Sequence, residues 1–255
     1  MAEPELPVLA EGDRKPPPNI LLAGVVGSTA YGLAHDGSDV DRLGCYAAPT
    51  VAFHGLHPPT GKAATWVSTH PDAVYHEAGK LAALLLKGNP TVTELAWLED
   101  YEVRTPEGDA LIEIRSSFLS ARAVRDAFLG YASQQFTRIS NRGDGSFSAD
   151  TRKRTAKHAR HLWRLLHQGT GLHLTGRLTV RLAPEIAVEC RRFGERIEAG
   201  DLDLARKALG GAEAAFDSPG VLPDRPDEEA AERWLRSVRA AYWDRECGTG
   251  KAVTA

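Results

Sequence analysis

A short segment after an apolar run combines the residue types that phosphate chemistry requires. Gly27 and Ser28 follow the run NILLAGVV, and Asp39 and Asp41 come after ten intervening residues. Gly27 has no side chain, so the backbone can approach a phosphate closely at this position. Ser28 offers a hydroxyl and a backbone N–H, and anions bind well where N–H groups begin a helix. The sequence therefore predicts a phosphate-binding loop at residues 27–28.

The spacing of Asp39 and Asp41 indicates a metal site beside this loop. If Val40 and its neighbours form a strand, the alternation of side chains puts both carboxylates on one face. Two adjacent carboxylates repel each other and are tolerated where a divalent cation bridges them. Mg²⁺ prefers one or two carboxylates together with substrate phosphates, so we expect Mg²⁺ (or Mn²⁺) here. The alternative is that Gly-Ser is a simple turn and Asp-x-Asp a solvated bend.

The surrounding sequence predicts the elements that must position these residues. Short apolar and β-branched runs indicate strands at 19–26, 40–47 and 64–69. Apolar stripes predict helices at 77–87 and 91–99, interrupted by Gly88-Asn89-Pro90. Amphipathic helices are then expected at 120–139, 149–168, 184–199, 201–216 and 227–244. Ser120 and Asp201 are the expected N-caps of two of them.

The order of these motifs resembles a known family. Gly-Ser, about ten residues and then Asp-x-Asp is similar to the signature of the polymerase-beta nucleotidyltransferase superfamily. Four stretches resemble predicted nucleotidyltransferases associated with RNA repair, the RlaP family, and they cover roughly residues 20–200 in patches. In order they are GSTAYGLAHDGSDVDRLG, DAVYHEAGKLAALLLKGNPTVTELAWL, KHARHLWRLLHQG and HLTGRLTVRL.

The resemblance implies an α+β fold and a division of the chain. We expect a small mixed β-sheet of polymerase-beta type at residues 19–104, which would be the nucleotidyltransferase catalytic domain. An α-helical domain is expected at 105–255, and a disordered tail at 1–18 that ends in three prolines.

The implied reaction is metal-dependent transfer of a nucleoside monophosphate from a nucleoside triphosphate to a hydroxyl, with release of pyrophosphate. Asp39 and Asp41 would hold two metal ions, one on the triphosphate and one that lowers the pKa of the attacking hydroxyl. The superfamily uses a third carboxylate. Asp72 is favoured as a catalytic and metal-binding residue, and Glu77 is the alternative.

Further residues match positions of the family that would bind the nucleoside triphosphate. Tyr31 and Ser38 belong to the loop motif, and Lys157, His158 and Arg164 belong to the basic segment KHARHLWRLLHQG. The alternative for the basic segment is a solvated helix face with a leucine core stripe. One face of the preceding helix could read a base or cap the domain interface through Tyr131, Gln134, Gln135 and Arg138.

The charge distribution bears on the acceptor. Residues 115–181 hold 13 Lys or Arg and 3 Asp or Glu, a net of +10 in a chain with a net charge of −3. A basic region of this kind could face phosphates, and together with the family resemblance it favours an RNA end as acceptor. A protein hydroxyl and a small molecule remain possible acceptors. A hypothesis of another class is a non-catalytic nucleotide- or RNA-binding module.

Composition excludes several other classes of protein. With 42% hydrophobic and 25% charged residues, the bulk of the chain is not disordered. No apolar run reaches the roughly 18 residues of a membrane span, so no membrane partner is expected. Cys45, Cys190 and Cys247 are far apart and suggest no disulfide framework. We therefore expect a reducing, cytoplasmic location.

Overall fold

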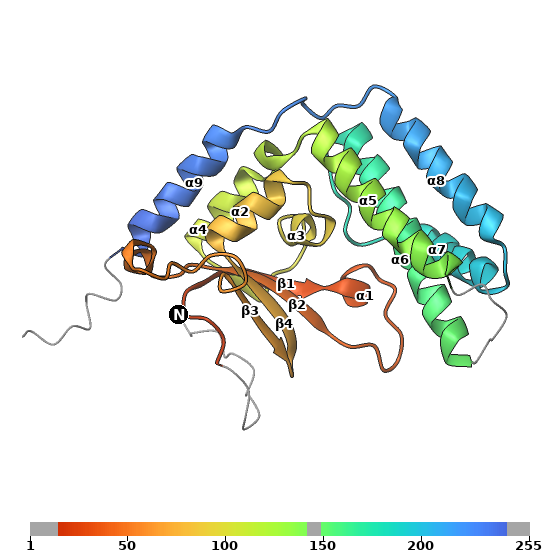
Figure 1. The fold of residues 1–255 in the computed structure, drawn as a ribbon, viewed down its shortest axis with the longest axis horizontal. Coiled ribbons are helices and arrows are strands. Elements are labelled where there is room, and N and C mark those ends of the chain that lie inside the picture. Colours follow the sequence, from red (N-terminus) through yellow and green to blue (C-terminus); the bar gives the residue numbers. More distant parts are fainter. Residues whose placement is uncertain (1–14, 142–148, 244–255) are drawn as a thin grey trace, which may run out of the picture.

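The computed structural model describes residues 15–141 and 149–243, and within them it confirms the predicted α+β fold. Five strands form one mixed sheet in the order β3-β4-β2-β1-β5 (Figure 1). β2 and β4 are parallel, and the other neighbouring pairs are antiparallel. The strands are β1 (Ile20–Val26), β2 (Asp41–Tyr46), β3 (Thr65–Thr69), β4 (Asp72–Glu77) and β5 (Val103–Arg104).

Helices make up most of the remaining described chain. Most of the predicted tail lies outside the described residues, and residues 15–18 carry no helix or strand. The α-helices are α1 (Gly27–Ala30), α2 (Ala78–Leu86), α3 (Pro90–Leu95), α4 (Pro106–Glu113), α5 (Ala121–Ser140), α6 (Ala149–Thr175), α7 (Pro184–Glu198), α8 (Leu202–Asp217) and α9 (Glu228–Ala241). Two short 3-10 helices are η1 (Thr50–His54) and η2 (Arg115–Phe118).

β4 is the main difference from the sequence prediction, which left Asp72 after a strand and began a helix at residue 77. Residues 72–77 instead pair with both β2 and β3, and their side chains alternate between exposed or half-buried and buried. The helix predicted at 77–87 is confirmed as α2. It begins at Ala78, and Glu77 is its N-cap, accepting a hydrogen bond from the Gly79 N–H at 2.8 Å. The segment DAVYHE is a strand because it pairs with β2 and β3 on its two sides. Because this pairing forms only in the folded protein, the segment alone does not indicate the strand.

The sheet and the helical group share one core. Figure 1 shows α2, α3 and α4 over one face of the sheet, and α5 to α8 grouped beside it. Leu43 of β2, Leu81 of α2 and Leu162 of α6 belong to the same cluster of buried side chains. Such a shared core fixes the helical group against the sheet, because interiors of this kind are packed like crystals.

Contacts also cross residue 104, where the catalytic domain was predicted to end. α4 packs on β1, where a Cβ on Gly108 would overlap the carbonyl oxygen of Leu21. α9 packs on α2 and α4, and the indole N–H of Trp234 donates to the carbonyl of Glu107 at 2.9 Å. The division at residue 104 stays a prediction. No helix among the described residues is both long enough and apolar enough to cross a membrane.

Candidate active site

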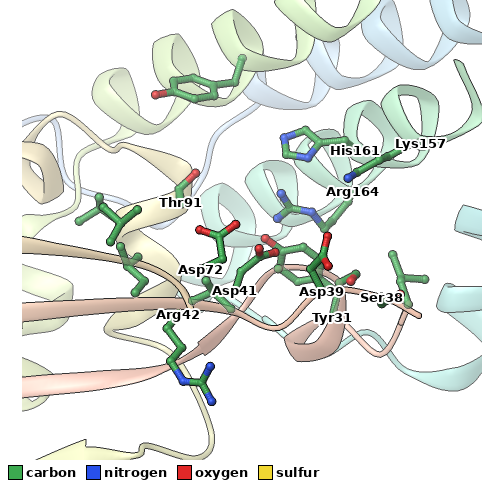
Figure 2. Close-up of a pocket in the computed structure, with 18 of the residues that line it drawn as sticks. Tyr31, Ser38, Asp39, Asp41, Arg42, Asp72, Thr91, Lys157, His161 and Arg164 are labelled. Atoms are coloured by element: carbon green, nitrogen blue, oxygen red, sulfur yellow. The ribbon is translucent and has the colours of Figure 1, made fainter. Parts of the chain in front are cut away.

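Two of the predicted carboxylates begin neighbouring strands. Asp41 is the first residue of β2 and Asp72 is the first residue of β4, and the parallel register pairs Arg42 with Ala73. Because the two strands run in the same direction, their first residues lie side by side. The predicted strand at 40–47 is observed as β2, which starts at Asp41. The condition for a shared strand face with Asp39 is therefore not met, because Asp39 and Val40 lie in the preceding loop. All three carboxylates nevertheless line one cavity (Figure 2).

The carboxyl group of Asp41 carries the electrostatic consequence of this cluster. Burial raises its pKa above the ordinary value, and the nearby charge of Asp72 and a hydrogen bond with that group raise it further. Asp39 acts in the same direction, whereas the Lys157 ammonium opposes the rise. The cluster therefore has an excess of negative charge that the surrounding side chains only partly offset.

Gly27 lies directly against the Asp41 carboxylate. Its φ is +71°, in the region that favours glycine, and a Cβ at this position would overlap the Asp41 side chain. Gly27 also begins α1, so Ser28 occupies the first turn of that helix. Gly27 of the candidate phosphate loop is thus in contact with Asp41, the second carboxylate of the Asp-x-Asp motif.

A cavity of about 820 Å³ lies over these groups. Gly27, Ser28, Tyr31 and Ser38 line it together with the carboxylates, and side chains of α6 line it as well. Figure 2 shows Lys157, His161 and Arg164 of α6 across the cavity from Asp72. A cavity with carboxylates on one wall and cations on another suits a ligand that carries both phosphates and metal ions.

The predicted basic residues of α6 have three different environments. Lys157 is exposed and lines the cavity. His158 is not among the lining residues, and its Nδ1 lies 2.8 Å from Oε1 of Gln135 on α5. Arg164 lines the cavity but is only 2% exposed, and it forms a 2.5 Å ion pair with Glu94 of α3. The structure therefore brings Lys157 and Arg164 to the site and places His158 in the α5–α6 contact.

Several residues that line the cavity were not among the predicted site residues, and His161 and Arg160 of α6 are two of them. His161 follows Lys157 by one helical turn, a signal that could have marked it as sharing the same face. Burial, followed by the charge of Arg164, lowers the pKa of His161 to about 3, so its imidazole is neutral. Arg160 also lines the cavity. Tyr131 lines it too, and its hydroxyl accepts a 2.8 Å hydrogen bond from the Asn89 side chain.

Glu77, the alternative third carboxylate, lies at the other end of β4. Its side chain is 2% exposed, and Oε1 is 2.5 Å from Nη1 of Arg239 on α9. It lines a separate cavity of about 490 Å³ together with Phe53, whose ring is 3.9 Å from the Arg239 guanidinium carbon. Asp72 is therefore the carboxylate beside Asp41, and Glu77 is held in an ion pair and a helix cap.

The carboxylate set fits a divalent metal by its chemistry. Asp39, Asp41 and Asp72 offer the hard oxygen ligands that Mg²⁺ and Mn²⁺ take, beside a loop suited to phosphate. Burial raises the pKa of Asp41 most, and the charges of Asp72 and Asp39, which a bound cation would neutralise, raise it further. Within the described residues, no three such side chains are already arranged tightly enough to count as a metal-binding cluster.

A small mixed sheet that carries a Gly-Ser loop and paired carboxylates, with helices beside it, is the architecture of a polymerase-beta-like nucleotidyltransferase. Residues 1–192 match the family described as the RNA repair pathway DNA polymerase beta family, RlaP. The chain belongs to this family.

The solved structures that match the chain include a nucleotidyltransferase-like protein from Exiguobacterium sibiricum 255-15, with 14% sequence identity and a TM-score of 0.31. The match covers 88% of this chain and 75% of that chain. At this TM-score the likeness carries no argument, so the family assignment depends on the sequence match. No curated protein matches the chain.

Proposed function

We propose that the protein transfers a nucleoside monophosphate from a nucleoside triphosphate to an acceptor hydroxyl in a metal-dependent reaction, with an RNA end as acceptor. The observation that carries this proposal is the meeting of Asp39, Asp41 and Asp72 beside the Gly27-Ser28 loop, across from Lys157. Membership of a polymerase-beta family supports the same reaction class.

The residues divide the work by charge. Gly27, Ser28 and Ser38 bind the triphosphate through backbone N–H and hydroxyl groups, and Lys157 neutralises its negative charge. Asp39, Asp41 and Asp72 would hold Mg²⁺ or Mn²⁺, which would supply positive charge against the triphosphate and a lower pKa for the attacking hydroxyl. Asp72 serves as a metal ligand or accepts the proton of that hydroxyl.

The bonds change as in other phosphoryl transfers. The acceptor oxygen bonds to the α-phosphorus, and the bond between this phosphorus and the α,β-bridging oxygen breaks. Pyrophosphate leaves with the electron pair, and the hydroxyl proton goes to Asp72 or to water. Positioning and charge stabilisation supply the catalysis, since no covalent intermediate with the protein is needed.

The basic start of α6 supports RNA as the acceptor. Arg152, Lys153 and Arg154 are exposed side chains that precede Lys157 on the same helix. They lie on an element whose next turns line the cavity. An exposed basic helix that leads to the site could bind an RNA backbone and guide its end toward the carboxylates. A protein hydroxyl and a small molecule are the competing acceptors. The cytoplasmic location stays a prediction.

A labelling experiment tests the proposal. Purified protein, Mg²⁺ and each α-labelled ribonucleoside triphosphate are incubated with and without an RNA pool, and the products are separated on denaturing gels. Asp39→Asn/Asp41→Asn is the test variant. Asp203→Asn/Asp224→Asn is the control, because these two exposed carboxyl groups lie outside the cavity.

Each outcome of the labelling experiment has one meaning. Label on RNA that is lost in the test variant and kept in the control supports the full proposal. Label on protein would keep the reaction class and overturn RNA as the acceptor. Triphosphate binding that persists or tightens in the test variant, with no labelled product from the wild type, would overturn the enzyme and favour a non-catalytic binding module.

A further inference from the structure

A chain of buried polar side chains connects the phosphate loop to the helical group. The hydroxyl of Tyr31 donates to Oε2 of Glu94 at 2.6 Å, and Nη1 of Arg164 donates to Oε1 of the same carboxylate at 2.5 Å. Arg164 also donates to Oε1 of Gln168 at 2.5 Å. Tyr31 is 9% exposed, Glu94 1%, Arg164 2% and Gln168 3%. These residues come from the end of α1, from α3 and from α6.

The charge of Arg164 is largely used within this cluster. Its guanidinium carbon lies 3.9 Å from the centre of the Tyr31 ring, so the cation is held between that ring and the Glu94 carboxylate. A paired arginine and glutamate have no net charge to offer a triphosphate. Burial raises the pKa of Tyr31 well above its ordinary value, which keeps its hydroxyl protonated as the donor.

The backbone of Tyr31 forms hydrogen bonds that connect the buried cluster to the Gly27-Ser28 loop. Its N–H donates to the carbonyl of Gly27 at 3.1 Å, and its carbonyl accepts from the Leu182 N–H at 3.2 Å. The Leu33 N–H donates to the carbonyl of Ser28 at 2.9 Å. The ring of Tyr31 is thus fixed by α3 and α6, while its backbone closes the turn that contains Gly27 and Ser28.

The far end of the cluster holds the segment that follows α6. Gln168 Nε2 donates to the carbonyl groups of Thr179 and Val180 at 2.9 and 3.1 Å. The next residues of this segment reach back to the loop through Leu182. Removal of one member of so buried a network affects the others, because each polar group depends on its partners for hydrogen bonds.

We infer that Glu94 and Arg164 are positioning residues that act through Tyr31 to set the Gly27-Ser28 loop for catalysis. On this inference, which rests on the proposed function for its kinetic tests, Arg164 supplies no direct charge to the triphosphate. The loop adopts its working geometry only while α3 and α6 hold the Tyr31 ring.

Glu94→Gln separates this inference from direct triphosphate binding by the sign of the effect. The substitution keeps the shape of the side chain and removes the negative charge that is paired with Arg164. If Arg164 bound the triphosphate, its freed charge would lower KM for the nucleotide. If the cluster positions the loop, kcat falls by about 10- to 100-fold while KM changes little, because misplacement of reacting groups slows the chemical step.

A double-mutant cycle tests the route of the effect. Tyr31→Phe removes the hydroxyl that donates to Glu94, and Arg164→Met removes the cation. If both act through one cluster, the double variant is about as impaired as the worse single variant. Independent, multiplicative losses in kcat would overturn the inference. The pair Glu94→Gln/Arg164→Met leaves no buried charge behind, so it keeps the test open if Arg164→Met alone does not fold.

Hydrogen exchange tests the same inference without catalysis, so an inactive wild type would count against the proposed function alone. In Glu94→Gln and in the charge-free pair, the amides of Tyr31 and Leu33 should exchange at least about tenfold faster. The amide of Asp109, which bonds to the Thr105 carbonyl at 2.8 Å, is the internal control. Glu232→Gln, at an exposed ion pair on α9, is the control variant. Unchanged exchange at Tyr31 and Leu33 would overturn the inference.

Discussion

Asp41 and Asp72 begin two neighbouring parallel strands, and the charge of Asp72 adds to the rise that burial causes in the pKa of Asp41. Asp41 belongs to the Asp-x-Asp motif, and Asp72 lies 31 positions later in the β3–β4 hairpin. The fold thus brings two carboxylates from separate segments close together. The charge that they share has consequences for stability that can be measured separately from activity.

Asp41→Asn should stabilise the metal-free protein and abolish its activity. The substitution removes a repulsion that the fold otherwise tolerates, so Tm in EDTA should rise by about 1–3 °C, a small shift because solvent screens part of the charge. Transfer activity should fall by more than about 100-fold. Added Mg²⁺ should raise the Tm of the wild type and have little effect on the variant. A lower Tm for the variant in EDTA would contradict this account of the cluster.

The same relationship predicts a pH dependence. The pKa of Asp41 is higher in the folded state than in an unfolded chain, so the folded state binds more protons above the unfolded pKa. The destabilisation should therefore grow as the pH rises through the raised pKa and disappear at lower pH, where the group is protonated. Urea unfolding in EDTA across this range should show a larger loss of stability in the wild type than in Asp41→Asn. Parallel curves would be inconsistent with repulsion at this residue.

Gly27→Ala should damage the site more than backbone strain alone explains. A Cβ at residue 27 would overlap the Asp41 carboxylate, in addition to the cost of a φ of +71°. Gly61→Ala is the matched control, because Gly61 has a φ of +56° and open space around it. Strain should cost each variant about 1 kcal/mol. Only Gly27→Ala should also displace Asp41 and lose transfer activity. Equal activity in both variants would show that the close approach of Gly27 to the Asp41 carboxylate is not needed for activity.

Arg239→Met tests the structural role of Glu77. Removal of the cation leaves the Glu77 carboxylate buried without its partner, at a cost of about 3 kcal/mol in the free energy of unfolding. Under conditions where the variant is folded, its kcat should stay close to that of the wild type, because the Asp72 end of β4 is unchanged. Chemical denaturation and steady-state kinetics give the two readouts. A large loss of kcat in fully folded protein would return Glu77 to the list of candidate catalytic residues.

The exposed basic residues at the start of α6 should govern RNA affinity. With Arg152, Lys153 and Arg154 all changed to Gln, the slope of log affinity for single-stranded RNA against log salt should fall by about 2. The KM for the nucleoside triphosphate should not change, since these side chains do not line the cavity. Gln at Arg206, Arg233 and Arg236, exposed arginines of α8 and α9, is the control of equal charge. An equal slope change in both variants would remove α6 as the RNA-binding element.

The part of the site that could be predicted from sequence is the part formed by contiguous residues. Gly27, Ser28, Asp39 and Asp41 occur within 15 positions, so their spacing alone indicates a loop followed by carboxylates. The fold class followed from strand-like runs and from the family resemblance. The N-caps at Ser120 and Asp201 were confirmed, because capping depends on local sequence.

The rest depends on contacts between distant segments. β4 is a strand because β2 and β3 lie on either side of it, and six residues give too little periodicity to indicate this alone. Glu94 has no motif around it, and its partners Tyr31 and Arg164 are 63 and 70 residues away in the chain. The sequence also gives no sign that His158 faces Gln135, 23 residues earlier in the chain, instead of the cavity.

The Glu77–Arg239 pair has a consequence for synthesis of the protein. Arg239 is 162 residues beyond Glu77, which ends the strand that Asp72 begins. During translation, the carboxylates and the phosphate loop leave the ribosome long before α9 does. The nascent chain is expected to bind nucleotide poorly until α9 has emerged and Arg239 has paired with Glu77 at the junction of β4 and α2.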